Sequence, residues 1–208
     1  MFRAQGKVEF MISFRLAGAV AAMAAALTAS GAQAQAAPFE GPYAGPFVGA
    51  LEHHFYLETT DLQTGDTDGR YFRDWQIGGG GMAGYDLAVS ERLRVGVEGA
   101  LQVGGGSPEA FVNGARYQQN SRFGYRLTGK VGLLAAERVM FFVKGGYGGD
   151  RFEIDNQANV AAATNWQHSF VVGTGAQIRL DPRIELRVEY EHLDTSSHAF
   201  FIGLPIRF

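Results

Sequence analysis

The most regular feature of the chain is a strict alternation of apolar residues with polar or small ones, which is the period of a β-strand. The alternation is clearest over 183–191, where Ile184, Leu186, Val188 and Tyr190 share one face and every residue of the opposite face is charged. Seven further segments fit the same template, near 43–55, 75–87, 92–101, 122–133, 139–147, 166–180 and 200–208. Nothing after residue 36 has the period of an amphipathic helix.

Two features indicate that these strands turn their apolar faces outward, into lipid. The segments are longer than the ~5–6 residues of ordinary globular strands, and a tilted membrane crossing needs ~9–11 residues. Aromatic residues stand near the expected strand ends, where they would meet the membrane interfaces: Tyr43, Phe55, Trp75, Tyr85, Trp166, Tyr190 and Phe208. A backbone in lipid has no water to bond, so such a sheet must close. The pattern predicts an all-β fold, an eight-stranded antiparallel up-and-down transmembrane β-barrel.

The connections between the expected strands alternate in length. Long polar ones cover 57–74, 104–120 and 153–164, and short ones cover 90–91, 135–137 and 181–182. Bacterial barrels have long external loops and short periplasmic turns, which this order matches, although the last external loop, near 194–197, is short. Asp61, Asp66 and Asp68 do not have the spacing of an EF-hand calcium loop.

An export signal precedes the strands. From Met11 the chain has one arginine, Arg15, then an apolar stretch over 16–27 that is too short for a membrane helix, then small residues ending in Ala34-Gln35-Ala36. We expect residues 1–36 to be a signal peptide with its true start at Met11, cleaved after Ala36 or alternatively after Ala34. The barrel domain would then span 37–208.

Composition adds exclusions. The chain has no cysteine, which rules out disulfides and thiolate metal sites, and its net charge of -3 does not indicate a nucleic-acid partner. Its 29 glycines are about twice the usual share. No cofactor is expected.

Both ends of the barrel domain resemble a known family. The segment 41–49, Gly-Pro-Tyr-Ala-Gly-Pro-Phe-Val-Gly, resembles the G-x-Y-x-G-x-x-x-G opening of the small outer-membrane β-barrel family, which includes OmpA/OmpX-type barrels and alphaproteobacterial porin-family outer-membrane proteins. The C-terminus resembles the strand that barrel-assembly machinery recognises, with the signal residues Phe200, Ile202, Leu204, Ile206 and Phe208. Pro205 departs from this pattern because proline removes a ladder hydrogen bond.

The resemblance implies a Gram-negative outer-membrane location. It also implies contact with membrane lipid and lipopolysaccharide, help from the barrel-assembly machinery and periplasmic chaperones, and a monomeric state.

The charged faces are expected to fill the interior, because an eight-stranded barrel is only wide enough for side chains. Buried charges must be paired or hydrated. We therefore predict an ion-paired plug, with a narrow gated conduit as the alternative. The residues expected in this network are Glu52, Arg94, Glu98, Arg126, Lys130, Lys144, Glu185, Arg187 and Glu189.

Four histidines, His53, His168, His192 and His198, are expected to face outward near the external strand ends. Barrel closure makes their strands consecutive, so the four could form one patch at the outer rim. The simpler interpretation is a polar interface with lipopolysaccharide headgroups. The sharper one is a pH-sensitive phosphate or metal contact. No metal site is assigned from the sequence.

We predict a structural or interaction role for the barrel, in which it supports envelope integrity or surface contacts. No catalytic residues are assigned. One alternative is a lipid A deacylase-like enzyme, since Ser196 and His198 fall on one face. Against this enzyme, lipid A deacylases place the histidine before the serine, and no acid is obvious on that face to orient the imidazole. The other alternative is a soluble lipocalin-like binding barrel with its apolar faces inward.

Overall fold

The computed structural model describes residues 37–60, 67–104, 109–112, 115–156, 163–193 and 197–208. For parts of the outlying strands, among them 53–60 and 115–122, it describes the backbone alone. Residues Ala37–Arg207 form one compact unit. Within the described residues, no helix has the length and apolar character needed to cross a membrane.

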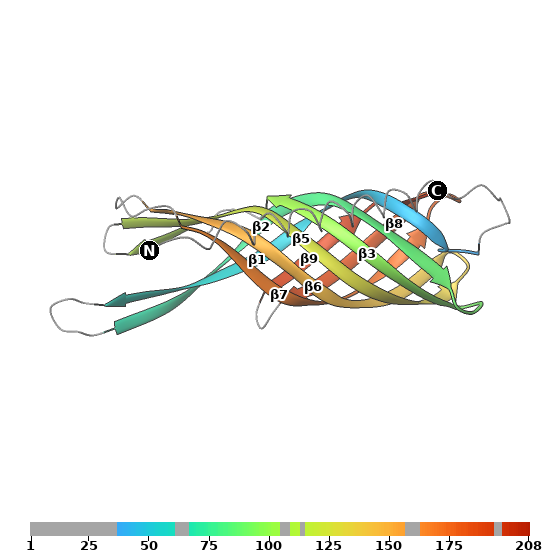
Figure 1. The fold of residues 1–208 in the computed structure, drawn as a ribbon, viewed down its shortest axis with the longest axis horizontal. Coiled ribbons are helices and arrows are strands. Elements are labelled where there is room, and N and C mark those ends of the chain that lie inside the picture. The colour runs from blue at the N-terminus through green and yellow to red at the C-terminus, as the bar shows by residue number, and fades with distance from the viewer. Residues whose placement is uncertain (1–36, 61–66, 105–108, 113–114, 157–162, 194–196) are drawn as a thin grey trace, which may run out of the picture. The chain divides into compact units, whose positions relative to one another are not determined.

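The described residues fold into ten strands: β1 (Gly41–Thr60), β2 (Thr67–Ala88), β3 (Leu93–Gly104), β4 (Glu109–Val112), β5 (Ala115–Ala136), β6 (Val139–Asn156), β7 (Ala163–Arg179), β8 (Glu185–Leu193), β9 (Ser197–Gly203) and β10 (Ile206–Arg207). Each pairs antiparallel with its neighbours in the order β10-β1-β2-β3-β5-β6-β7-β8-β9. A further pairing of β1 with β9 closes the sheet, and Figure 1 shows the tilted strands winding around one axis.

The ten strands occupy eight strand positions around the barrel, because two of these positions each hold two consecutive strands. β3 and β4 follow each other along β5, and β9 and β10 follow each other along β1. The gap between β9 and β10 falls at Pro205, which has no N–H to donate to the ladder. Its ring is fully buried on the inner face. The eight-stranded antiparallel barrel is thus confirmed.

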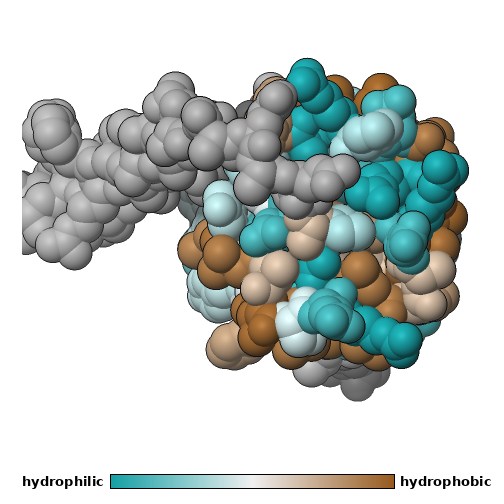
Figure 2. All heavy atoms as spheres, turned by 90° about the vertical axis from the view of Figure 1, so that its right-hand side faces the viewer, coloured by the Kyte–Doolittle hydropathy of each residue, from teal (hydrophilic) through white to brown (hydrophobic). Residues whose placement is uncertain are grey.

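The outer wall is apolar. Ile77, Val97, Leu127, Phe170 and Val172 are each at least 60% exposed, and many similar side chains surround them. Figure 2 looks at the end that carries the short turns, where hydrophilic side chains gather across the end and hydrophobic ones lie at its edge. Apolar side chains on the outside are the reverse of a lipocalin, so that alternative is wrong.

The predicted register of the first strand is also wrong. Tyr43 was expected at the membrane interface, on the lipid side of the strand. Its side chain and that of Leu51 are instead buried in the lumen at 0% and 1% exposure, while Val48 is 54% exposed. Apolar residues occur on both faces of this strand, so alternation alone could not choose between them. The lumen gains more from Tyr43, whose hydroxyl donates a 2.6 Å hydrogen bond to Glu98.

The three long connections also differ from prediction, because much of each is strand. β1 and β2 stay paired out to Thr60 and Thr67, beyond the level at which β9 and β3 leave them. β4, β5, β6 and β7 continue outward in the same way. The pairing satisfies backbone groups that a loop would leave to water. Asp61 and Asp66 lie outside the described residues, and Asp68 pairs with Thr59 in the β1–β2 ribbon.

Candidate functional site

The lumen holds its charged side chains in linked groups. Near the short-turn end, the Arg207 guanidinium contacts Glu185 at 2.6 Å and Asp86 at 2.8 Å. The Lys130 ammonium lies 3.0 Å from Asp86 and donates to the Tyr43 hydroxyl at 3.1 Å. Two cations therefore share the Asp86 carboxylate, and its residue is fully buried.

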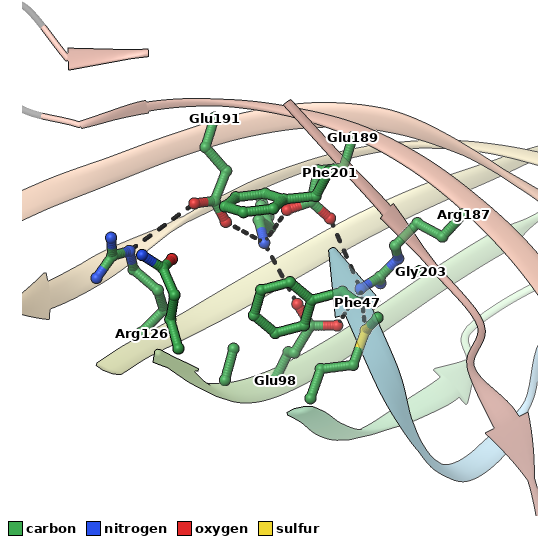
Figure 3. Close-up of a pocket in the computed structure, with 12 residues that line it drawn as sticks. Phe47, Glu98, Arg126, Arg187, Glu189, Glu191, Phe201 and Gly203 are labelled. Atoms are coloured by element: carbon green, nitrogen blue, oxygen red, sulfur yellow. Dashed lines mark hydrogen bonds and ion pairs between the residues drawn. The ribbon is translucent and has the colours of Figure 1, made fainter. Parts of the chain in front are cut away.

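The middle of the lumen is organised around Lys144, whose ammonium faces three carboxylates. Figure 3 labels these three acids, Glu98, Glu189 and Glu191. The ammonium contacts Glu189, Glu191 at 2.6 Å and Glu98 at 3.3 Å. The Arg187 guanidinium binds Glu98 directly and lies 3.6 Å from Glu189. Two cations from β6 and β8 thus face three carboxylates from β3 and β8.

Two arginines complete the charged lumen in different ways. The Arg126 guanidinium forms a bidentate contact with the Asp150 carboxylate, with N–O distances of 3.1 and 2.9 Å, and its Nε lies 3.8 Å from a carboxylate oxygen of Glu191. Arg94 was expected to pair with an acid, but its guanidinium donates to the backbone carbonyls of Pro38, Ser90 and Leu93 instead. Arg94 therefore ties the residues before β1 to the wall.

Apolar clusters lie on either side of the charged groups. Toward the external end, Leu51, Val171, Leu193, Ala199 and Phe201 pack together, with Phe47 against them.

Toward the short-turn end, Phe39 packs with Leu134 and Met140. The Phe39 backbone has φ of +60°, a strained value for an aromatic residue. The guanidinium groups of Arg179 and Arg207 lie about 6 Å from its ring centre, which helps to hold it there.

One small cavity lies among the charged groups. The cavity in Figure 3 is lined by Met82, Gln102, Phe201 and the charged groups around Lys144, and its free volume is about 20 Å³. That volume fits one water molecule. The buried Gln102 Nε2 and Arg187 Nη2 find no protein acceptor, and both residues line the cavity.

The structure places Glu52 outside the predicted interior network. Glu52 pairs across the strands with Trp75, whose ring is exposed on the outer wall, while the adjacent Leu51 points inward. Its carboxylate is nearly covered and lies 4.0 Å from His198 Nε2. This follows from the register error in β1. The other members of the predicted set, Arg94, Glu98, Arg126, Lys130, Lys144, Glu185, Arg187 and Glu189, are buried.

Several lumen residues were missed by the sequence reasoning. Asp86, Asp150, Glu191 and Arg207 are as tightly paired as the predicted residues. The signal for Glu191 and Arg207 was present, because each stands two residues from another inward-facing position of its strand. Tyr43 was missed because an aromatic residue near a strand end also fits an interfacial girdle.

Two members of the predicted histidine patch contact each other in the structure. His192 and His198 pair across β8 and β9 on the outer wall, with 3.4 Å between their Nδ1 atoms, and the Tyr190 hydroxyl lies 2.7 Å from His198 Nδ1.

His168 lies elsewhere on the outer wall. It stacks between the rings of Tyr147 and Trp166, with its Nδ1 3.2 Å from the Tyr125 hydroxyl. The His53 side chain lies outside the described part of the structure, as does Ser196.

The five residues of the expected assembly signal form one outward row. The side chains of Phe200, Ile202, Leu204, Ile206 and Phe208 are 40–66% exposed. The residues between them face the lumen, including Phe201 and Arg207. Recognition of this row during assembly stays a prediction.

Known proteins share this architecture. The chain aligns over 81% of its length with Neisserial surface protein A, covering 98% of that protein at 12% identity with a TM-score of 0.52. It aligns similarly with Ail, the attachment invasion locus protein of Yersinia pestis (16% identity, 81% and 99% coverage, TM-score 0.49), and with the N-terminal β-barrel domain of Pseudomonas aeruginosa OprF (9%, 81% and 98%, 0.46).

At these identities, the likeness to Neisserial surface protein A concerns the fold alone. A search of curated proteins finds no match. The family model of the outer membrane protein β-barrel domain matches residues 19–208, which is most of the chain. The chain therefore belongs to the outer membrane β-barrel family and is a protein of the Gram-negative outer membrane.

Proposed function

We propose that this protein is a non-enzymatic, monomeric barrel with an occluded lumen, which supports envelope integrity or presents its external strands for surface contacts. The observation that carries the proposal is the filled lumen. Charged side chains within 4 Å of their partners occupy its middle, and apolar clusters lie on either side of them. Ion-paired groups around a cavity that holds about one water molecule do not offer a hydrated path.

Conductance in a planar lipid bilayer tests this proposal. We expect no steps above the baseline over a range of voltage and pH, while a wide porin handled in the same way conducts. The variant Glu98→Ala/Lys144→Ala removes opposite charges together and keeps the net charge of the lumen. Steps that appear only in this variant would identify the side-chain plug as the barrier. Discrete steps in the wild type would instead support the gated conduit.

One observation favours the enzyme alternative. The Glu52 carboxylate lies beside His198 Nε2, so an acid does stand next to the imidazole that sequence reasoning left without one. A mass spectrum of lipid A from cells with and without the protein separates the two functions. We expect identical spectra. The structural role would be contradicted if lipid A lost an acyl chain in cells with the wild-type protein but kept it in cells with the Ser196→Ala variant.

We further propose that the mature chain begins at Ala37. The backbone nitrogen of Ala37 lies 3.2 Å from a carboxylate oxygen of Glu40. Cleavage after Ala36 would turn this nitrogen into an ammonium group, and the hydrogen bond into an ion pair. N-terminal sequencing of the protein from outer membranes should give Ala-Pro-Phe-Glu, and a start at any other residue would contradict this site.

The proposed partners during biogenesis are periplasmic chaperones and the barrel-assembly machinery. Membrane lipid and lipopolysaccharide would surround the finished barrel. The outward row that ends in Phe208 supports the first assignment, and the apolar wall supports the second. No cofactor or nucleic acid enters this proposal.

A further inference from the structure

We propose that His192 and His198 form a binding site for a single transition-metal cation of the zinc type on the outer wall of the barrel. The two residues face each other across β8 and β9, directly below the short connection that joins these strands. His198 keeps 37% of its side chain exposed, so a cation can reach the pair from the external side.

The separation of the two imidazoles is the geometric basis of the proposal. Zn²⁺ binds imidazole nitrogen at about 2.0–2.1 Å and prefers tetrahedral angles, so two nitrogens on the same ion stand about 3.3–3.4 Å apart. The Nδ1 atoms of His192 and His198 are 3.4 Å apart. Both nitrogens are therefore already spaced to hold one ion without movement of the backbone.

Glu52 supplies the second argument, because it faces the other nitrogen of the same ring. Its carboxylate lies 4.0 Å from His198 Nε2 and is only 9% exposed. A carboxylate at this position favours the tautomer with the proton on Nε2, which leaves the Nδ1 lone pair free for a metal. An acid placed on a lipid-facing wall is costly, and such residues usually have a functional partner.

The surroundings also define the limits of the site. No group of three or more His, Cys, Asp or Glu residues among those described is arranged to hold a metal, so the described residues offer two ligands, and we expect solvent to complete the shell. The Tyr190 hydroxyl lies within hydrogen-bond distance of His198 Nδ1, at 2.7 Å, and the metal must compete with this bond. We therefore expect affinity in the micromolar range or weaker.

The proposal is tested by isothermal titration calorimetry, in which ZnCl₂ is added to the tag-free protein in detergent micelles. We expect one Zn²⁺ per barrel, and affinity at least tenfold lower in His192→Gln or His198→Gln. Glu52→Gln should weaken binding about 10–100-fold, as loss of such outer partners does. His168→Gln is the matched control, because His168 also lies on the outer wall but stacks between aromatic rings.

Three results would overturn the site: no stoichiometric binding, binding that persists in the double histidine variant, or equal loss in His168→Gln. Unchanged affinity in Glu52→Gln would remove Glu52 from it. For each variant, a band that moves on an SDS gel when the sample is boiled shows that the unboiled protein is folded. Zn²⁺ should also raise the urea midpoint of the wild type, and this readout does not depend on any variant folding. An unchanged midpoint at saturating Zn²⁺ would count against the site.

Discussion

At the scale of single residues, each lumen charge depends on a few partners from other strands. Glu98 on β3 accepts from Tyr43 on β1, Lys144 on β6 and Arg187 on β8. A buried ion pair adds little compared with apolar packing, but removal of one partner leaves an uncompensated charge. The lumen is therefore sensitive to single truncations even though its charges balance.

Glu98→Ala should lower the free energy of unfolding by about 3–5 kcal/mol, because Lys144 and Arg187 lose their shared carboxylate. Urea unfolding in micelles, followed by tryptophan fluorescence, measures this change. Glu91→Ala, in the exposed turn between β2 and β3, is the control and should stay within about 0.5 kcal/mol of the wild type. Equal effects of the two substitutions would mean that Glu98 is not paired in the lumen.

Residue alternation located most of the lumen charges because charged side chains are excluded from a lipid-facing wall. Alternation failed for Glu52, because a charged residue on the lipid-facing wall can be recognised only from the residues around it in space and not from its position in the strand. The proximity of Glu52 to His198 joins β1 to β9, which are far apart in sequence and adjacent only because the sheet closes. No local pattern carries such a contact.

At the scale of elements, the strands fit closely where glycines stand in the wall. In the run 78–81 of β2, a Cβ at Gly80 would overlap the carbonyl oxygen of Leu101 on β3, while a Cβ at Gly81 would meet nothing within 4 Å. The high glycine content thus has a local cause at Gly80, where a side chain would force two backbones apart.

Gly80→Ala should destabilise the barrel by about 1–3 kcal/mol, the usual cost of overpacking. Gly81→Ala should be neutral or stabilising by up to about 1 kcal/mol, because alanine restricts the unfolded chain. The two variants differ by one position, so the same unfolding assay in micelles compares them directly. A larger loss in Gly81→Ala than in Gly80→Ala would contradict the β2–β3 register.

The depth of a strand in the membrane gives another prediction. Val97 lies near the middle of β3 and Val103 near its external end, and both are more than half exposed on the same face. Val97→Arg should cost about 2–4 kcal/mol in lipid vesicles and Val103→Arg only about 0–1 kcal/mol, since the cost falls toward the interface. A cost that is the same at both positions would mean that this face does not cross the hydrocarbon layer.

Element boundaries were harder to predict than element type. The polar composition of 57–74 and 104–120 indicated loops, yet most of these residues continue as paired strands. Outside the membrane a β-ribbon no longer needs an apolar face, so the composition changes while the backbone pairing does not. The short turns lie within about two residues of their predicted positions, because there the apolar strands on both sides end abruptly.

At the scale of the whole molecule, closure ties these features together. The β1–β9 pairing leaves no free edge along the closed wall and brings Phe47 against Phe201, whose rings meet edge to face at 5.1 Å. Closure could be predicted because an open sheet in lipid would leave backbone groups without partners. The layers of side chains within the lumen could not be predicted, because they depend on which residues of the eight strand positions lie at the same level along the barrel axis.

The central claim is a closed barrel that turns its apolar wall to outer-membrane lipid. The most direct test is the gel mobility of the protein from isolated outer membranes, compared in SDS with and without boiling. We predict a compact, fast-running band in the unboiled sample that shifts to the position of the unfolded chain after heating. A single band that does not shift, recovered from the soluble periplasmic fraction, would contradict the claim.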